Sequence, residues 1–210
     1  MSSKWALAVI FLLMMGVSDS IYLTYHHYEI NILAPEAKSF CAISKTIDCD
    51  KAATSAGSMM MGIPVATWGM FAFFFIMFFI LVERILYWEV QKALYCFIYL
   101  ILWLMAAFSA YEAFVSFAVL KVVCIMCVIL YLTMVFLLIS CKRALGIGHL
   151  EFFLLLYDLF FRSFSRTLLR KGASVAIIAV VFSSMIAFGL DYKFQNHFTY
   201  QRMTMILGNP

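Results

Sequence analysis

The cysteines are the residues of this chain that could carry redox chemistry, and four of the six form two pairs. Cys124 and Cys127 make a Cys-Ile-Met-Cys motif three residues after Lys121. Near the start of a helix, this spacing places both sulfurs on one face, where unpaired N–H groups, the helix dipole and the lysine favour thiolate over thiol. Because a thiolate is the attacking species in disulfide exchange, the motif predicts a reactive pair. Tyr131 falls on the same face and could donate its phenol O–H to a ligand.

The second pair, Cys41 and Cys49, lies in a polar segment, whereas Cys96 and Cys141 lie near helix ends and are interpreted as packing residues. The pattern argues against a metal centre. Cys41 and Cys49 are separated by seven residues, unlike zinc or iron–sulfur knuckles, and Val128 stands where c-type haem attachment requires histidine. We therefore predict no metal.

The composition predicts an all-α integral membrane protein. Hydrophobic residues make up 66% of the chain and charged residues 12%, and the mean hydropathy is +1.00. Such a chain cannot hide its apolar surface in water, and its apolar runs are continuous rather than alternating, which favours helices over a β-barrel. The net charge of +4 is modest and does not suggest a nucleic-acid partner, so membrane lipid is the expected surrounding.

Five stretches are long enough to cross a bilayer as helices. They run from Trp5 to Tyr25, Ile63 to Val82, Ala93 to Leu120, Val122 to Cys141 and Ala173 to Leu190. Lys and Arg are most concentrated in residues 142–171, which predicts an N-in/C-out orientation. Both cysteine pairs then lie on the outer side, one of them in the loop 26–62, as a thiol relay would require.

Two further segments lie outside these stretches. Residues 151–170 are apolar but carry charges every fourth position, which predicts a helix in the cytoplasmic interface. Residues 192–210 are more polar and are expected to form an outer tail. Asp19, near the outer end of the first stretch, is interpreted either as a group that steers protons or as a hydrated carboxylate.

The motifs together resemble the vitamin K epoxide reductase family in its bacterial branch. The resemblance is carried by Cys41-x7-Cys49, Ser55, the sequence Gly-Ile-Pro-Val-Ala-Thr-Trp-Gly at 62–69, Cys124-Ile-Met-Cys127 and Tyr131. The DsbB family of quinone-linked disulfide generators also has two pairs, but there the CxxC motif precedes the wider pair, the reverse of the order found here.

The resemblance implies a four-helix bundle around a quinone, ubiquinone or menaquinone, with a fifth transmembrane helix beside it, all within residues 1–191. Cys124 and Cys127 would be the active-site pair, and Cys41 and Cys49 the shuttle pair. Ser55 and Tyr131 would belong to the quinone site. Independently of the resemblance, Trp68 could line a ring pocket, although ordinary packing is the favoured interpretation because aromatic residues make up 18% of the chain.

The resemblance also implies a partner and a location. The electron donor would be a thioredoxin-like protein similar to DsbA, soluble or fused, with residues 192–210 as the start of a removed domain of that kind. The chain would lie in a bacterial inner membrane and support disulfide bond formation. Val65 stands about where animal members carry an asparagine that contacts the quinone, which favours a respiratory quinone over vitamin K epoxide.

Three alternatives remain open from the sequence, one of them a metal- or haem-binding membrane protein. A non-enzymatic membrane protein could hold Cys41 and Cys49 in a purely structural disulfide, with Cys124 and Cys127 inert. A generator of the DsbB type would share the chemistry but not the motif order.

Overall fold

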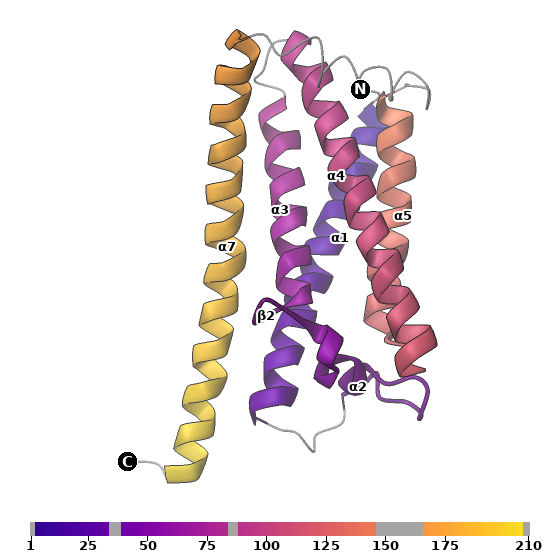
Figure 1. Ribbon diagram of the computed structural model, residues 1–210, viewed down its shortest axis with the longest axis vertical. Coiled ribbons are helices and arrows are strands. Elements are labelled where there is room, and N and C mark those ends of the chain that lie inside the picture. The colour runs from indigo at the N-terminus through magenta and orange to yellow at the C-terminus, as the bar shows by residue number, and fades with distance from the viewer. Residues whose placement is uncertain (1–2, 34–38, 84–87, 146–165, 208–210) are drawn as a thin grey trace.

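The computed structural model describes residues 3–33, 39–83, 88–145 and 166–207, and long helices dominate this part of the chain (Figure 1). The long helices are α1 (Ser3–Tyr28), α3 (Val65–Glu83), α4 (Trp88–Phe114), α5 (Ile125–Leu145) and α7 (Arg166–Leu207). Proline would remove a helix hydrogen bond and clash with the preceding turn. The three prolines of the sequence, at 35, 64 and 210, all fall outside these helices.

The short elements gather at one end of the long helices, opposite the N-terminus (Figure 1). They are the π-helices η1 (Glu29–Leu33) and η3 (Val115–Leu120), the helix α2 (Cys49–Thr54), the 3-10 turn η2 (Ala56–Ser58) and the antiparallel strands β1 (Met59–Met60) and β2 (Ile63–Pro64). Gly62 has φ +80° in the tight turn between the strands, a conformation that glycine adopts without strain. We call this end of the molecule the cysteine end, because all four cysteines of the two pairs lie there.

Four helical segments are long and apolar enough to cross a membrane, judged by length and composition over the described residues. They are Leu7–Leu33, Ile98–Leu120, Ile125–Arg143 and Ile177–Leu207, and Val65–Leu81 is a shorter apolar helix. Large apolar side chains also remain on the outside of the helices; Phe11, for example, is 65% exposed and Met185 72%. These features identify an all-α membrane protein whose exposed apolar side chains suit a lipid surrounding.

Helix α1 packs against α3 and α5, α4 packs against α5, and α7 lies against α3 on the outside (Figure 1). The buried core between α1, α3, α4 and α5 includes Leu13, Phe73, Leu102 and Met134. Gly16 permits the close approach of α1 and α3, because a Cβ atom at this position would lie 2.6 Å from the ring of Phe73. These contacts leave a cavity toward the cysteine end.

Several predicted helix ends differ from the structure, and two of these differences change the interpretation of the chain. Helix α5 begins at Ile125 rather than at Val122, because Lys121 adopts a left-handed backbone (φ 53°) that ends η3 and separates it from the next helix. Helix α7 continues to Leu207, so residues 192–207 are helical where a separate tail was expected. The drop in hydropathy at Asp191 marks a change of surroundings, but no proline or glycine lies between Asp191 and Leu207 to stop the helix.

Only the end of the predicted interfacial helix 151–170 falls within the described residues. Residues 151–165 lie outside the described residues, and residues 166–170 form the start of α7.

A buried polar network joins α7 to α1 and α3. Asp191 is only 8% exposed, and its Oδ1 accepts hydrogen bonds from the Tyr28 hydroxyl (3.1 Å) and the Thr67 hydroxyl (2.8 Å). The Thr67 hydroxyl also lies 3.4 Å from that of Thr24. A carboxylate in such a place is tolerated only when its oxygens are hydrogen-bonded, so this network specifies where α7 docks.

We predict that Asp191→Ala lowers the free energy of unfolding by about 1–3 kcal/mol, because two buried hydroxyls lose their acceptor. Thermal unfolding in detergent measures the change. Asn196→Ala, at an exposed position on the same helix, should change stability by no more than about 0.5 kcal/mol. Equal effects of the two substitutions would contradict a docking role for Asp191.

Candidate functional site

Backbone hydrogen bonds attach the cysteine loop to the segment that precedes α5. Ile47 and Val123 form an isolated parallel bridge; the Val123 N–H donates to the Thr46 carbonyl (2.6 Å), and the Asp48 N–H donates to the Val123 carbonyl (3.1 Å). Cys49 follows Ile47 by two residues and Cys124 follows Val123 by one. The bridge therefore brings the two cysteine pairs to the same place, although 75 residues separate Cys49 from Cys124.

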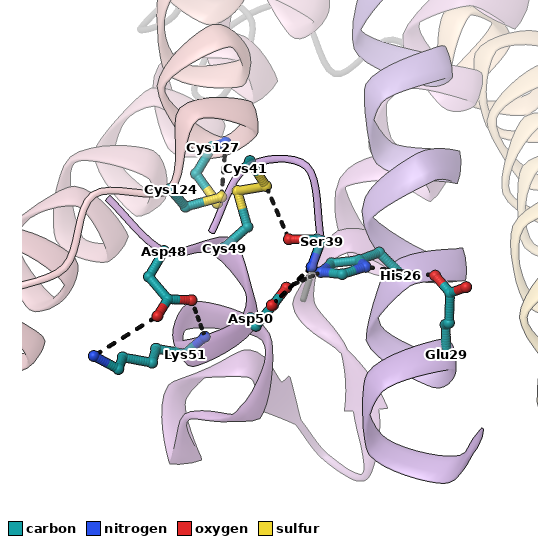
Figure 2. The surroundings of a disulfide bond; sticks show 10 residues. All are labelled: His26, Glu29, Ser39, Cys41, Asp48, Cys49, Asp50, Lys51, Cys124 and Cys127. Atoms are coloured by element: carbon teal, nitrogen blue, oxygen red, sulfur yellow. Dashed lines mark hydrogen bonds and ion pairs between the residues drawn. A yellow bond between two sulfur atoms is a disulfide. The ribbon is translucent and has the colours of Figure 1, made fainter. Parts of the chain in front are cut away.

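The sulfurs of the two pairs meet in one buried cluster, as the relay prediction required. Cys41 and Cys49 form a disulfide with a Cα–Cα distance of 5.7 Å, and Figure 2 shows Cys124 and Cys127 beside it. Cys41, Cys49 and Cys124 are 0%, 1% and 2% exposed, and Cys127 packs against them. Cys124 and Cys127 are free thiols. Water is thus excluded from a site in which a thiolate could reach a disulfide.

Cys124 occupies the N-cap of α5. Its carbonyl accepts the first helical hydrogen bond, from the Val128 N–H (3.0 Å), and its Sγ accepts a hydrogen bond from the Cys127 N–H (3.2 Å). A serine or aspartate side chain makes the same bond at a helix start. The hydrogen bonds from the Cys127 thiol and backbone outweigh the opposing effect of burial and lower the pKa of the Cys124 thiol. The geometry thereby favours the thiolate at Cys124.

A second polar network holds the loop disulfide against α1 (Figure 2). His26 Nε2 lies 2.9 Å from Asp50 Oδ1, and the Ser39 N–H donates to Asp50 Oδ2 (3.0 Å). The Ser39 hydroxyl lies 3.5 Å from the sulfur of Cys41. Partial burial alone would raise the pKa of Asp50, but the hydrogen bonds from Ser39 and the contact with His26 outweigh it and lower that pKa. Sequence reasoning missed this network, since its members are far apart in the chain.

A cavity of about 440 Å³ opens beside the sulfur cluster, and three of the four cysteines of the two pairs, Cys49, Cys124 and Cys127, line it. Ser55, Trp68 and Tyr131, the predicted quinone-site residues, line it as well. The Ser55 hydroxyl donates to the Ala52 carbonyl (2.8 Å), and the Trp68 Nε1–H donates to the Met60 carbonyl (3.2 Å). Both side chains are thus fixed by the local backbone.

The rest of the wall is mainly apolar and aromatic. It includes Val65, Phe71, Phe73, Met105, Phe108 and Leu130. From outside, Phe188 of α7 packs edge-on against Trp68, with 5.4 Å between the ring centroids, and stacks on Phe71 at 6.0 Å. Helix α7 therefore braces the wall without lining the cavity.

Two acidic residues stand near the CxxC pair. Glu112 of α4 lines the cavity, and the sequence analysis did not single it out, although a carboxyl group within an apolar membrane helix is itself a signal of function. Asp19 of α1 has both carboxyl oxygens buried without a hydrogen-bond partner within the described part of the chain. Cys124 and Cys127 lie within electrostatic range of Asp19, which the sequence analysis interpreted either as a group that steers protons or as a hydrated carboxylate.

Of the two remaining cysteines, Cys141 is away from this site. Cys141 is buried in the core between the long helices, in agreement with its interpretation as a packing residue. The side chain of Cys96 lies outside the described part of the structure. Among the described residues, no group of three or more His, Cys, Asp or Glu side chains is placed to hold a metal ion.

Comparison with known proteins gives one match. A family model described as the Vitamin K epoxide reductase family matches residues 7–141, a region that contains all four clustered cysteines and excludes α7. No curated protein and no solved structure matches the chain at a significant level.

We predict that Asp50→Asn weakens the attachment of the cysteine loop. Because the pKa of Asp50 is lower in the folded protein than its unfolded value of about 3.9, its contribution to stability is complete above that value and is lost as the pH falls through the folded-state pKa. Hydrogen–deuterium exchange at the Ser39 amide should therefore show lower protection in Asp50→Asn at pH 6, and a loss of protection in the wild type only below about pH 4.

The matched control is Lys45→Ala, an exposed substitution in the same loop. It should leave the protection of the Ser39 amide unchanged. Protection in Asp50→Asn equal to that of the wild type would show that the carboxylate does not hold the loop.

Proposed function

Because the chain belongs to the vitamin K epoxide reductase family, we propose that it is a membrane thiol–quinone oxidoreductase that reoxidises a thioredoxin-like partner. Electrons pass from the partner to Cys41 and Cys49, then to Cys124 and Cys127, and finally to a quinone. The observation that carries this proposal is the buried sulfur cluster on the wall of one apolar cavity. A purely structural loop disulfide would not need a second pair of thiols packed against it.

The cavity suits a quinone ring. Its volume of about 440 Å³ lies within the range of small-molecule sites, and its wall combines aromatic side chains with a few polar groups. Trp68 and Tyr131 could position the ring, and the Tyr131 hydroxyl could donate to a quinone oxygen and stabilise the charge that develops there. When bound, a quinone supplies an acceptor for two electrons and two protons.

The first step is attack by a partner thiolate on the Cys41–Cys49 disulfide. The partner dithiol is oxidised to a disulfide, and the loop pair is reduced. Since Cys41 and Cys49 are 0% and 1% exposed, a soluble partner can reach them only if the loop moves. The His26–Asp50–Ser39 network is the attachment that this movement must release.

The second step passes the electrons within the cluster. The Cys49 thiolate attacks Cys124 of a Cys124–Cys127 disulfide, and Cys127 leaves as a thiolate. Cys41 then attacks Cys49, which re-forms the loop disulfide and releases Cys124. The stabilised thiolate of Cys124 makes it a good leaving group in this step. A loop disulfide beside two free thiols, as in the structure, is the arrangement reached at this point.

Several features support the assignment of roles. Cys49 lines the cavity together with Cys124 and Cys127, which makes it the member of the loop pair that exchanges with them. Cys127 lies in the first turn of α5 and lines the cavity, where it can deliver electrons to the ring.

We place the cysteine end of the helices on the outer side of a bacterial inner membrane, with the N-terminus inside. In this orientation the thiols face the compartment in which disulfide bonds form and persist. The partner is a DsbA-like protein, soluble or fused, and the acceptor is ubiquinone or menaquinone. The arrangement is a four-helix bundle of α1, α3, α4 and α5 around the quinone, with α7 as the fifth transmembrane helix.

The direct test is quinone reduction by the purified protein with a reduced thioredoxin-like protein as donor. We expect Cys127→Ala to lose at least about a hundredfold in rate, because the thiol that faces the cavity is gone. Cys141→Ala, which removes a thiol from the distant core, is the matched control and should retain the rate. Equal rates for the wild type and Cys127→Ala would refute the proposal.

The order of the thiol–disulfide exchange steps predicts which mixed disulfide accumulates in each cysteine variant. Without Cys127, the Cys124 thiolate can attack Cys49 and form a mixed disulfide that no neighbouring thiol of its own pair resolves, so Cys127→Ala should accumulate a Cys49–Cys124 bond. Cys124→Ala should accumulate no bond at Cys49. Mass-spectrometric mapping under non-reducing conditions distinguishes the two variants, and absence of the Cys49–Cys124 bond from Cys127→Ala would exclude this sequence of steps.

A further inference from the structure

Glu112 is the one carboxylic acid among the described residues that line the cavity. Helix α4 and η3 present Ser109, Glu112 and Ser116 to the cavity at spacings of three and four residues, the period of one helical face. The neighbouring positions Met105 and Phe108 on that face are apolar. A single carboxyl group is thus placed in a wall whose other side chains are hydroxyls, cysteine sulfurs, the His27 imidazole and apolar or aromatic groups.

The surroundings of Glu112 do not neutralise it. Within the described part of the chain it makes no hydrogen bond or ion pair, and it lies in the half of the candidate membrane span Ile98–Leu120 that is nearer the cysteine end. Cys127 and Tyr131 of α5 are within its electrostatic range. A carboxyl group without a partner of its own can take up and give up a proton, and this one shares the cavity wall with Cys127.

Five other titratable side chains of the described residues lie in the cavity wall or close to it. From α5 they are Cys124, Cys127 and Tyr131, from α1 His27, and Asp19 of α1 lies close to the cysteines without lining the cavity. Among these groups, only Glu112 combines a place in the cavity wall with proximity to Cys127 and a carboxyl that can both take up and return a proton.

Resting on the function proposed above, we propose that Glu112 is a catalytic residue that transfers a proton between the Cys124–Cys127 pair and the quinone site. Formation of the Cys124–Cys127 disulfide releases two electrons and two thiol protons, and conversion of a quinone to a quinol takes up the same two electrons and two protons. The carboxyl of Glu112 gives its proton to a quinone oxygen and regains a proton from the Cys127 thiol. The second proton, which Cys124 has already given up as a thiolate, returns from the aqueous side, so that the two protons lost by the thiols equal the two gained by the quinone.

The first readout needs no quinone. The full chain is cycled between the dithiol and disulfide states of Cys124 and Cys127 with dithiothreitol and a soluble disulfide, and infrared difference spectra record the carbonyl stretch of protonated carboxyl groups. We expect a band that responds to the cysteine redox state, disappears in Glu112→Gln and shifts in Glu112→Asp. The band should persist in Asp19→Asn and in Tyr111→Phe, a matched control at the adjacent position, which is 60% exposed.

The second readout is quinone reduction. In Glu112→Gln we expect kcat to fall by about a hundredfold, the KM for quinone to stay within about twofold, and the pH dependence of kcat to flatten. Glu112→Asp should recover part of kcat, because it restores a titratable carboxyl, and Tyr111→Phe should match the wild type.

The outcomes separate this inference from the proposed function. If the wild type reduces no quinone, the proposed function fails, and the infrared experiment alone decides whether Glu112 exchanges a proton with the cysteines. If the wild type is active and Glu112→Gln keeps its kcat or loses activity only through KM, the inference is overturned while the proposed function stands. An infrared band that vanishes in Asp19→Asn instead of Glu112→Gln would overturn it as well.

Discussion

The bridge between Ile47 and Val123 is the interaction on which the site depends. Its hydrogen bonds fix the cysteine loop against the start of α5, so that a disulfide from one segment and two thiols from another share a single buried volume. Thiol–disulfide exchange requires direct contact between sulfurs, and a flexible loop would seldom present them together. Parallel pairing of only a few residues supplies this proximity, and the N-cap geometry of Cys124 then favours the thiolate there.

Burial of the sulfurs protects thiol exchange within the cluster, but it also prevents a partner protein from reaching the loop disulfide. With Cys41 and Cys49 shielded from solvent, exchange inside the cluster is protected from other thiols and from water. The same burial keeps out a protein partner, so the arrangement that favours the internal step cannot also be the one that accepts electrons from outside. Asp50 contacts His26 and Ser39 and thereby joins the cysteine loop to α1. These contacts would have to break before the loop could open to a partner.

Helix α7 packs against the region that the family model matches, although it lies outside that region in the sequence. The region matched by the family ends at residue 141, before α7 begins. Nevertheless Asp191 joins α7 to α1 and α3 through two hydrogen bonds, and Phe188 packs against two aromatic residues of the cavity wall. The additional helix thus stabilises the wall of the candidate quinone site from the lipid-facing side.

The sequence by itself determined the membrane setting, the positions of most helices and the choice of the two cysteine pairs as candidates for redox chemistry, because apolar length and a CxxC motif at a helix start are local properties. It also placed Ser55, Trp68 and Tyr131 in one site through motif resemblance. The tertiary structure alone decided the start of α5, the helical course of residues 192–207, the contacts of Asp50 and Asp191, and the position of Glu112 in the cavity wall. Each of these depends on backbone conformation or on partners distant in the chain, and periodicity and spacing along a single segment contain no information about which segments meet.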